Sequence, residues 1–329
     1  MSRRESSSGR SVPAAPRSGP KVVALGGGHG LAASLSALRH VTDNLTAVVT
    51  VADDGGSSGR LRREFGVLPP GDLRQALAAL CGDDEWGRTW AEVLQHRFES
   101  DGPLAGHAVG NLLIVAMWQR LGAHVTGLDW VARLLGAQGR VLPMCDVPLE
   151  ITAQVEGLDP NDPTAVRTLR GQSVVAATTG RVLSVALEPA NPPACPEALA
   201  AIRAADGIVL GPGSWFTSVL VHLLVPELSA VLHEAKGTRV LTLNLAPQAG
   251  ETRGFSPERH LEVLRAHAPD LRIDVVVAHD AFVADQPALA AAASALGAEL
   301  VVADVARRDG SPRHDPERLA QVYAKVLGG

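Results

Sequence analysis

A cluster of glycines directly after a buried strand constrains this chain more than any other feature. Residues 22–25 read Val-Val-Ala-Leu, a continuous apolar run of the kind that lies inside a sheet. Residues 26–30 read Gly-Gly-Gly-His-Gly, and residues 31–40 then carry leucines at helical spacing. A second apolar strand is expected over residues 45–52. This order of strand, glycine turn, helix and strand opens a doubly wound α/β fold.

The alternation of strands and helices continues through most of the chain. Helical patterns cover residues 84–98, 109–121, 128–135, 196–206, 217–236 and 257–267, and strand patterns cover residues 207–210, 238–245, 273–278 and 300–303. One stretch differs, with short strands expected at 149–155, 168–176 and 182–187. The sequence therefore predicts a Rossmann-like, doubly wound, mostly parallel sheet with a small β-rich insertion at about residues 141–187.

The first 20 residues differ in composition from the rest. Residues 1–20 are rich in Ser, Arg, Pro and Gly and contain no apolar stretch, which predicts a disordered tail and no signal peptide. Residues 21–329 show no internal repeat and no linker, and they are numerous enough to bury a large core. We therefore expect a single domain over residues 21–329 that contains the β-rich insertion.

Charge, hydropathy and cysteine content argue against several classes of protein. The net charge is −5 and no Lys/Arg-rich run lies in the folded part, so no nucleic-acid partner is expected. No run reaches the roughly 18 apolar residues that a membrane helix needs, so no membrane span is expected. The three cysteines are far apart, which argues against a zinc site or disulfide framework and favours a reducing compartment. We expect a cytoplasmic protein.

The glycine cluster is typical of a phosphate-binding loop. Glycines let the backbone approach a ligand closely, and the helix that follows offers free N–H groups and the positive end of its dipole. A plain tight turn is the alternative, and the histidine is either a donor to an anion or a solvent-facing loop residue. The residues expected to contact a ligand here are Gly27, Gly28, His29 and Gly30.

Two adjacent carboxylates end the second expected strand. Asp53 and Asp54 lie about 20 residues after the glycines, where a dinucleotide-binding fold places its ribose contact. Because neighbouring carboxylates repel each other, an arginine or Mg²⁺ nearby would hold them together, which makes this pair the candidate metal site. An Asx turn in an irregular Gly/Ser stretch is the structural alternative. Ser57, Ser58 and Arg62 extend the candidate site.

Two further pairs of polar residues follow. Asp72 is expected to cap a helix over residues 73–80, and Arg74 places a cation in its first turn, where it opposes the helix dipole. The anion that compensates Arg74 is either a neighbouring carboxylate or a bound phosphate. His107 and Asn111 lie four residues apart on one helical face, as ligand contacts or as satisfied buried polar groups.

A second glycine turn, at residues 211–214, repeats the arrangement of the first. Turns that follow two parallel strands lie at the same edge of the sheet, so a ligand with two ends would bridge them. Polar loop residues after the strand at 238–245 reach the same edge. The candidate contacts in these segments are Gly211, Gly213, Ser214, Thr217, Ser218, Asn244, Gln248, Glu251 and Thr252.

Together these segments resemble the YvcK family of gluconeogenesis factors, within the superfamily that includes the phospholactyl transferase CofD. The resemblance rests on residues 26–31, 50–62, 68–74, 105–107 with 110–113, 211–214 with 217–219, and 248 with 250–252. These motifs keep the family's order across nearly the whole chain after residue 20. Several of them are long and unusual, so the match is specific.

The resemblance implies a UDP-sugar ligand, UDP-N-acetylglucosamine, bound by a Rossmann-like regulatory protein without turnover. The implied role is control of cell shape and of cell-wall precursors during growth on gluconeogenic carbon sources, through a cell-wall or regulatory protein partner. The resemblance leaves open whether the protein forms a homo-oligomer. Mg²⁺ is the one cofactor considered, and no catalytic residue is assigned because no Ser–His–Asp arrangement or nucleophile elbow is present.

Two alternatives remain beside the regulatory protein. The CofD relatives imply an Mg²⁺-dependent transferase that acts on a nucleotide-diphosphate donor. An NAD-dependent oxidoreductase would explain the glycines and the acidic residue, but the stretch at residues 53–62 and the lack of a hydride-handling site count against it.

Overall fold

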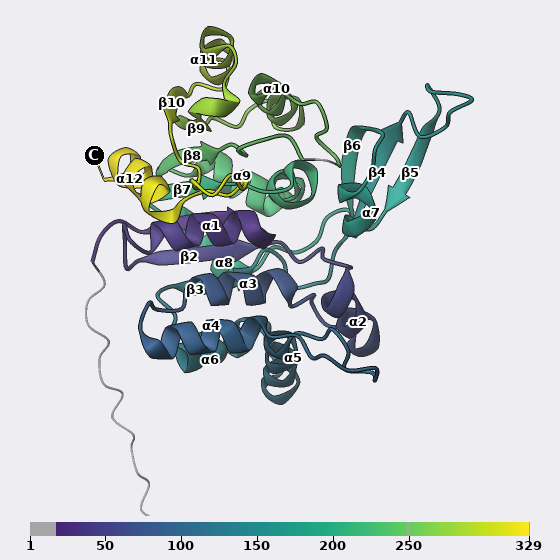
Figure 1. Ribbon diagram of the computed structural model, residues 1–329, viewed down its shortest axis with the longest axis vertical. Coiled ribbons are helices and arrows are strands. Elements are labelled where there is room, and N and C mark those ends of the chain that lie inside the picture. The colour runs from purple at the N-terminus through teal and green to yellow at the C-terminus, as the bar shows by residue number, and fades with distance from the viewer. Residues whose placement is uncertain (1–17, 249, 329) are drawn as a thin grey trace, which may run out of the picture.

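Seven parallel strands form the main sheet of the molecule. The computed structural model describes residues 18–248 and 250–328, so most of the tail expected over residues 1–20 lies outside the described residues. The strand order is β10-β9-β8-β7-β1-β2-β3, and each neighbouring pair is parallel (Figure 1). The strands are β1 (Val22–Gly26), β2 (Leu45–Val49), β3 (Arg140–Pro143), β7 (Gly207–Leu210), β8 (Thr238–Thr242), β9 (Val275–His279) and β10 (Glu299–Ala303). The expected α/β fold with a mostly parallel sheet is confirmed.

The order of the strands reverses between β1 and β7. From β1 the chain moves outward to β2 and β3, whereas from β7 it moves the other way to β8, β9 and β10. Because crossovers between parallel strands are right-handed, the connecting helices of the two halves lie on opposite faces of the sheet. Ligands of such folds bind where the two halves meet, beyond the carboxyl ends of the strands. β1 and β7 are the two strands that the glycine turns follow.

Helices cover the sheet in two layers. The first layer contains α1 (Gly28–Leu38), α3 (Gly71–Ala79) and α12 (Pro316–Leu327). The second contains η1 (Trp215–Val219), η2 (Leu220–Leu224), α8 (Pro196–Arg203), α9 (Pro226–Glu234), α10 (Pro257–His267) and α11 (Gln286–Ser294). Three more helices extend the molecule beside β3, namely α4 (Glu85–Gln95), α5 (Val109–Leu121) and α6 (His124–Leu135), and α2 (Gly56–Phe65) contacts α5 (Figure 1).

Burial on both faces explains the continuous apolar strands of this sheet. All five residues of β1 are buried. The apolar stripe of α1 consists of Leu31, Leu35 and Leu38, each of which exposes 1% or less of its surface. Burial of one leucine side chain contributes about 1.5–3 kcal/mol. This stripe therefore fixes α1 on the sheet, and with it the glycine turn at its N-terminus.

A small antiparallel sheet projects from the main body (Figure 1). It has the order β5-β4-β6 and consists of β4 (Glu150–Glu156), β5 (Val166–Arg170) and β6 (Arg181–Glu188), with the short helix α7 (Gln172–Ala176). The β-rich insertion is thus present, but the expected boundaries are wrong at two points. Residues 140–143 pair with β2 in the main sheet, and residues 172–176 are helical instead of extended.

Two local expectations are also wrong. The Gly/Ser-rich stretch after Asp54 is not irregular, since α2 spans Gly56–Phe65 and is followed by Gly66, which takes the left-handed conformation with φ 65°. Burial of Leu61 outweighs the low helix propensity of the stretch. Asp72 does not cap α3, because the helix begins at Gly71, two residues before the expected start at residue 73, and the Asp72 carboxylate accepts from the backbone of Gly28 instead.

Other features agree with the sequence. Ser256 and Asp315 cap α10 and α12 through side-chain acceptors, as their Ser-Pro and Asp-Pro steps indicate. The three cysteines are buried and free. Within the described residues, no single helix is long and apolar enough to cross a membrane; one bent pair, Trp215–Leu224 with Pro226–Glu234 at 81°, meets the test by length and composition only.

Candidate ligand-binding site

The two glycine turns touch each other where the strand order reverses. Gly30 packs so closely on the second turn that an added Cβ atom would lie 2.6 Å from the Cα atom of Gly213. Gly28 and Gly211 have φ angles of 56° and 71°, which residues with side chains rarely adopt. Glycine is therefore required both by the backbone conformation and by the contact between the turns. The turns form one continuous backbone surface beyond β1 and β7.

Two cavities lie on this surface and share a wall. The larger has a volume of about 650 Å³ and the smaller a volume of about 330 Å³. Both are lined by His29, Gly30, Gly213 and Gln248. The shared wall therefore consists largely of the two glycine turns. Each volume lies within the range of about 300–1,000 Å³ that small-molecule sites occupy.

Half of the predicted contact residues line these cavities. Those at the smaller cavity are Gly27, Gly28, His29, Gly30, Asp53, Asp72, Gly213, Ser214, Ser218 and Gln248. Asn244 lines the larger cavity only. The predicted residues that line neither cavity are Asp54, Ser57, Ser58, Arg62, Arg74, His107, Asn111, Gly211, Thr217, Glu251 and Thr252. Several of these hold the lining residues in place.

Two acidic side chains face the smaller cavity. Asp72 is 7% exposed, and its burial and the nearby Asp53 carboxylate raise its pKa to about 7, although a hydrogen bond from Gly28 and the charge of Arg74 act in the opposite direction. The Oδ2 atom of Asp72 has no hydrogen-bond partner among the described residues. Asp53 is half-buried, and its Oδ1 atom accepts from the Gly55 N–H at 2.9 Å. A cation or a ligand hydroxyl would supply the partner that Asp72 lacks.

A network of buried polar side chains lies behind Asp72. The Nε atom of Arg74 donates to Asn111 Oδ1 at 2.9 Å, and Asn111 Nδ2 donates to Ser57 Oγ at 3.0 Å. Ser57 Oγ also lies 3.0 Å from His107 Nδ1. Burial lowers the pKa of Arg74 to about 10, while the neighbouring carboxylates favour its charged form. Asn111, Ser57 and His107 therefore hold Arg74 in place near the carboxylates of Asp53 and Asp72. The Nη1 atom of Arg74 has no hydrogen-bond partner among the described residues.

The loop after β8 holds the second glycine turn. Asn244 Oδ1 accepts from the Gly213 N–H, and Asn244 Nδ2 donates to the Gly213 carbonyl, both at 2.9 Å. Gln248 Nε2 donates to Ser214 Oγ at 3.2 Å. The Gln248 N–H donates to Thr252 Oγ1 at 3.0 Å, which keeps the loop folded.

Glu251 attaches the same loop to the buried start of η1. Its Oε1 atom accepts from the Phe216 N–H at 3.3 Å. Burial raises the pKa of Glu251 to about 7, although hydrogen bonds from the backbone of Phe216 and Trp215 lower it. Glu251 is 3% exposed, and Thr217 and Thr252 are fully buried. These three predicted contact residues are enclosed in the protein, and Glu251 and Thr252 support the loop.

The insertion contributes to the wall of the smaller cavity through α7, which a hydrogen bond to Asp54 holds in place. Asp54 Oδ1 accepts from the Ser173 N–H at 2.9 Å, and Arg62 Nη1 donates to the Leu149 carbonyl at 2.6 Å. Next to Ser173, Gln172 lines the smaller cavity. The two adjacent carboxylates of the sequence therefore have different contacts, because Asp53 lines the cavity and Asp54 holds α7.

Part of the cavity wall was not identified by the sequence motifs. In the larger cavity these residues are Ala32, Ala33, Ser36, Pro212, Leu245, Ala246, Pro247, Arg307, Pro312, Arg313, His314 and Pro316, and in the smaller cavity they are Gln75 and Gln172. A sequence pattern could have identified two of these residues. Arg307 and Arg313 flank an Asp-Gly-Ser-Pro turn after the last strand, at the same edge of the sheet as the glycine turns.

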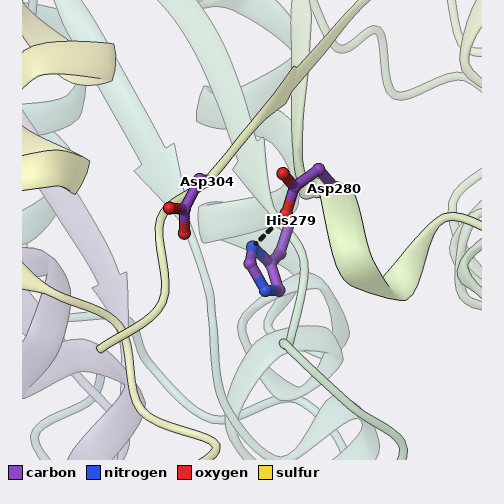
Figure 2. Close-up of side chains that lie close together, drawn as sticks. All are labelled: His279, Asp280 and Asp304. Atoms are coloured by element: carbon purple, nitrogen blue, oxygen red, sulfur yellow. Dashed lines mark ion pairs between the residues drawn. The ribbon is translucent and has the colours of Figure 1, made fainter. Parts of the chain in front are cut away.

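Another group of metal-ligand side chains lies at the ends of β9 and β10. His279, Asp280 and Asp304 offer ligand atoms that lie within 4.8 Å of one another. Figure 2 shows His279 Nδ1 paired with the Asp280 carboxylate, at 3.0 Å. Asp304 forms an ion pair with Arg318 of α12. Each carboxylate thus already has a side-chain partner, and we assign no ligand to this group.

Comparison with known proteins shows the family of the chain. The model of the family described as 2-phospho-L-lactate transferase CofD matches residues 22–314. The chain belongs to the CofD/YvcK family. Its curated relatives include a "Putative gluconeogenesis factor" of Mycobacterium tuberculosis, 54% identical over 308 residues that cover 93% of this chain and 90% of the relative. The "Gluconeogenesis factor" of Listeria monocytogenes is 35% identical over 319 residues, which cover 94% and 96% of the two chains.

A solved structure shares the fold of this CofD/YvcK-family chain. It is the crystal structure of a upf0052 family member from Bacillus halodurans, with a TM-score of 0.81 and 32% sequence identity. The similarity covers 93% of this chain and 98% of that chain. The family expected from the sequence motifs is thereby confirmed, and the glycine turns lie within the matched region.

Proposed function

We propose that this CofD/YvcK-family protein binds a UDP-sugar, UDP-N-acetylglucosamine in particular, as a cytoplasmic regulatory protein without turnover. The pair of cavities joined across two glycine turns is the observation that carries the proposal. A nucleotide sugar has three chemically different parts, a nucleoside, a diphosphate and a sugar. The glycine turns and the N-terminus of α1 suit the diphosphate, and the cavities on either side suit the other two parts.

The linings of the cavities support this arrangement. The larger cavity combines apolar residues such as Leu245 and Pro247 with Arg307, a combination that suits a nucleoside. The smaller cavity presents Asp53, Asp72 and Gln75, whose carboxyl and amide groups suit the hydroxyls of a sugar. Carboxylates repel phosphate, so the diphosphate belongs on the shared wall of glycine backbone and His29.

The biological role is part of the same proposal. We infer control of cell shape and of cell-wall precursors during growth on gluconeogenic carbon sources, exerted through a protein partner. The name gluconeogenesis factor among the relatives supports a role linked to carbon metabolism.

An Mg²⁺-dependent transferase acting on a nucleotide-diphosphate donor is the second candidate. The description of the matching family model, 2-phospho-L-lactate transferase, favours it. So does the pair of carboxyls in the smaller cavity, because burial and the Asp53 charge raise the pKa of Asp72 and a divalent cation between the two carboxyls would relieve their repulsion. Asp54, which the sequence pairs with Asp53 as a metal ligand, would have to leave Ser173 to join them.

Calorimetric titration separates these candidates. UDP-N-acetylglucosamine, GDP and NAD are each titrated with and without Mg²⁺ into the wild type, Asp53→Asn and the control Asp280→Asn, which makes the same change at an exposed carboxylate outside both cavities. We expect micromolar binding of the UDP-sugar, about tenfold weaker in Asp53→Asn because a charged hydrogen-bond acceptor in the cavity wall becomes neutral, and unchanged in the control.

Analysis of the ligand after overnight incubation decides between binding and turnover. An intact UDP-sugar supports the regulatory protein. Cleavage that requires Mg²⁺ and is lost in Asp53→Asn supports the transferase. Binding of NAD alone contradicts both proposals.

A further inference from the structure

A buried tyrosine of the C-terminal helix joins several segments that form the candidate ligand-binding site. Tyr323 of α12 is the only tyrosine of the chain, and its surface is fully buried. Its hydroxyl oxygen lies 3.0 Å from Ser34 Oγ of α1 and 2.9 Å from Thr242 Oγ1 at the end of β8. Ser34 Oγ donates in turn to the carbonyl of Gly211, at 2.9 Å. We name these four residues the Tyr323 network.

The direction of each hydrogen bond in the Tyr323 network follows from the number of protons available. A carbonyl only accepts, so the single hydroxyl proton of Ser34 is used at Gly211. Ser34 therefore accepts from Tyr323, and Tyr323, whose own proton is then used, accepts from Thr242. All three hydroxyl-bearing residues are fully buried. Loss of the phenol hydroxyl would leave the Thr242 proton without its acceptor inside the protein, which is costly.

The Gly211 end of the Tyr323 network holds the second glycine turn. Gly213 of this turn packs against Gly30 of the first turn, and both residues line the two cavities. An added Cβ atom on Gly211 would lie 2.8 Å from the carbonyl oxygen of Thr242, so the turn also touches the end of β8. Gly211 therefore contacts both of the residues to which the Tyr323 hydroxyl bonds.

The first turn of α12 belongs to the wall of the larger cavity. Arg313, His314 and Pro316 line this cavity, and Pro316 is the first residue of α12. Tyr323 lies about two helical turns further on, where α12 packs on α1 (Figure 1). One side chain thus connects two parts of the cavity wall, namely the start of α12 and the second glycine turn.

We propose that Tyr323 is a positioning residue for the ligand, whose hydroxyl holds the second glycine turn in its binding conformation through Ser34. The inference rests on the proposed binding of a nucleotide sugar at this turn. A phenylalanine ring would fill the same space between α12 and the sheet, so packing alone does not require the hydroxyl. The hydroxyl is buried at a cost that only its hydrogen bonds offset, and those bonds lead to the glycine turn.

Calorimetric titration with UDP-N-acetylglucosamine tests the role of the hydroxyl. The variants are Tyr323→Phe, Ser34→Ala, their combination, and the control Thr42→Val. Thr42 is also a buried hydroxyl residue, but it bonds to Pro20 and Asn44 at the amino ends of the strands and lines neither cavity.

We expect Tyr323→Phe and Ser34→Ala each to bind the UDP-sugar at least about fivefold more weakly than wild type. The double variant should differ from Ser34→Ala by less than about threefold, because both changes act through the Gly211 carbonyl. Tyr323→Phe and Thr42→Val should both melt a few degrees below wild type, but Thr42→Val should keep the wild-type affinity. A merely structural role of Tyr323 would lower the melting temperature alone.

Amide hydrogen exchange in the empty protein tests the same role without a ligand. The Gly213 N–H donates to Asn244, and we expect it to exchange about tenfold faster in Tyr323→Phe and at the wild-type rate in Thr42→Val. Wild-type affinity in Tyr323→Phe overturns the inference, and so does wild-type exchange at Gly213 or an equal loss of affinity in Thr42→Val. A wild type that binds no UDP-sugar contradicts the proposed function, whereas exchange at Gly213 still decides whether Tyr323 positions the turn.

Discussion

The side-chain amide of Asn244 makes two hydrogen bonds to a single residue, accepting from the N–H of Gly213 and donating to its carbonyl, both at 2.9 Å. A backbone segment would pair in the same way, so the loop after β8 holds the turn after β7 much as a neighbouring strand would. Because this turn separates the two cavities, Asn244 sets the geometry of the wall on which we place the diphosphate.

Replacement of Asn244 tests that role. Asn244→Ala removes both hydrogen bonds, and we expect a loss of about 1–3 kcal/mol in stability and at least about tenfold weaker binding of UDP-N-acetylglucosamine. Urea unfolding and calorimetric titration measure the two effects. Asn161→Ala, at an exposed turn of the insertion, is the control and should match wild type in both. Wild-type affinity in Asn244→Ala would show that the turn keeps its shape without these two hydrogen bonds.

The contact between the two glycine turns gives a second prediction. Gly30 lies in α1, where alanine would ordinarily be favoured by about 1 kcal/mol. Its Cβ atom would, however, meet the backbone of Pro212 and Gly213, which cannot turn aside as a side chain can. We expect Gly30→Ala to lower the melting temperature and to abolish measurable ligand binding. The control Gly102→Ala meets only a side-chain atom at 3.9 Å and should leave both unchanged.

Features that neighbouring residues encode could be predicted from the sequence, whereas features that depend on contacts between distant segments could not. The glycine turns were predictable because a buried strand, a glycine run and an apolar helical stripe are all encoded within about 20 neighbouring residues. That the two turns touch follows from the place of β1 and β7 in the sheet, which order along the chain does not specify. Arg307 and Arg313 were missed because they reach the larger cavity only through the packing of α12 on α1.

Two further differences between the expected and the observed structure also come from contacts between distant segments. The stretch after Asp54 has the local composition of a turn, but α2 forms there because Leu61 is buried and Gly66 ends the helix. Asp72 has the local signature of a cap, yet its carboxylate bonds to Gly28, more than 40 residues away in the sequence. In each case a contact between distant segments outweighs a local propensity.

The buried carboxyl of Asp72 gives a prediction about pH. The folded protein keeps its proton up to a pKa of about 7, whereas the unfolded chain releases it near the ordinary value of 3.8. Between these values the folded state binds more protons, so the stability of the wild type falls as pH rises from about 4 to about 7 and then levels off. Asp72→Asn carries no such proton, and we expect it to escape this loss.

Urea unfolding from about pH 4 to about pH 8 measures this effect. The stability of Asp72→Asn relative to wild type should rise through the window and reach an advantage on the order of 2–4 kcal/mol at the upper end. The raised pKa of Glu251 acts in the same direction, but it is present in both proteins and cancels. Asp101→Asn, at an exposed carboxylate, should follow the wild-type profile. Parallel profiles for Asp72→Asn and wild type would mean that Asp72 is charged throughout.

The separate roles of Asp53 and Asp54 give the last prediction. Asp54→Ala removes the acceptor of the Ser173 N–H, a hydrogen bond to a charged group worth about 1.5–3 kcal/mol. Amide hydrogen exchange in α7 should therefore become about 10–100-fold faster. Because Gln172 of α7 lines the smaller cavity, we also expect several-fold weaker ligand binding, through disorder in the wall instead of loss of a direct contact.

Two control variants test whether Asp54 affects binding by holding α7. Asp162→Ala removes an equivalent acceptor, for the Thr164 N–H at 3.1 Å in an exposed turn of the insertion, and should leave α7 unchanged. Asp53→Asn should weaken ligand binding while α7 keeps its protection, because Asp53 bonds within its own turn. If Asp54→Ala instead leaves α7 protected and removes an effect of Mg²⁺ on binding, Asp54 is a metal ligand, and α7 is held by the packing of the insertion alone.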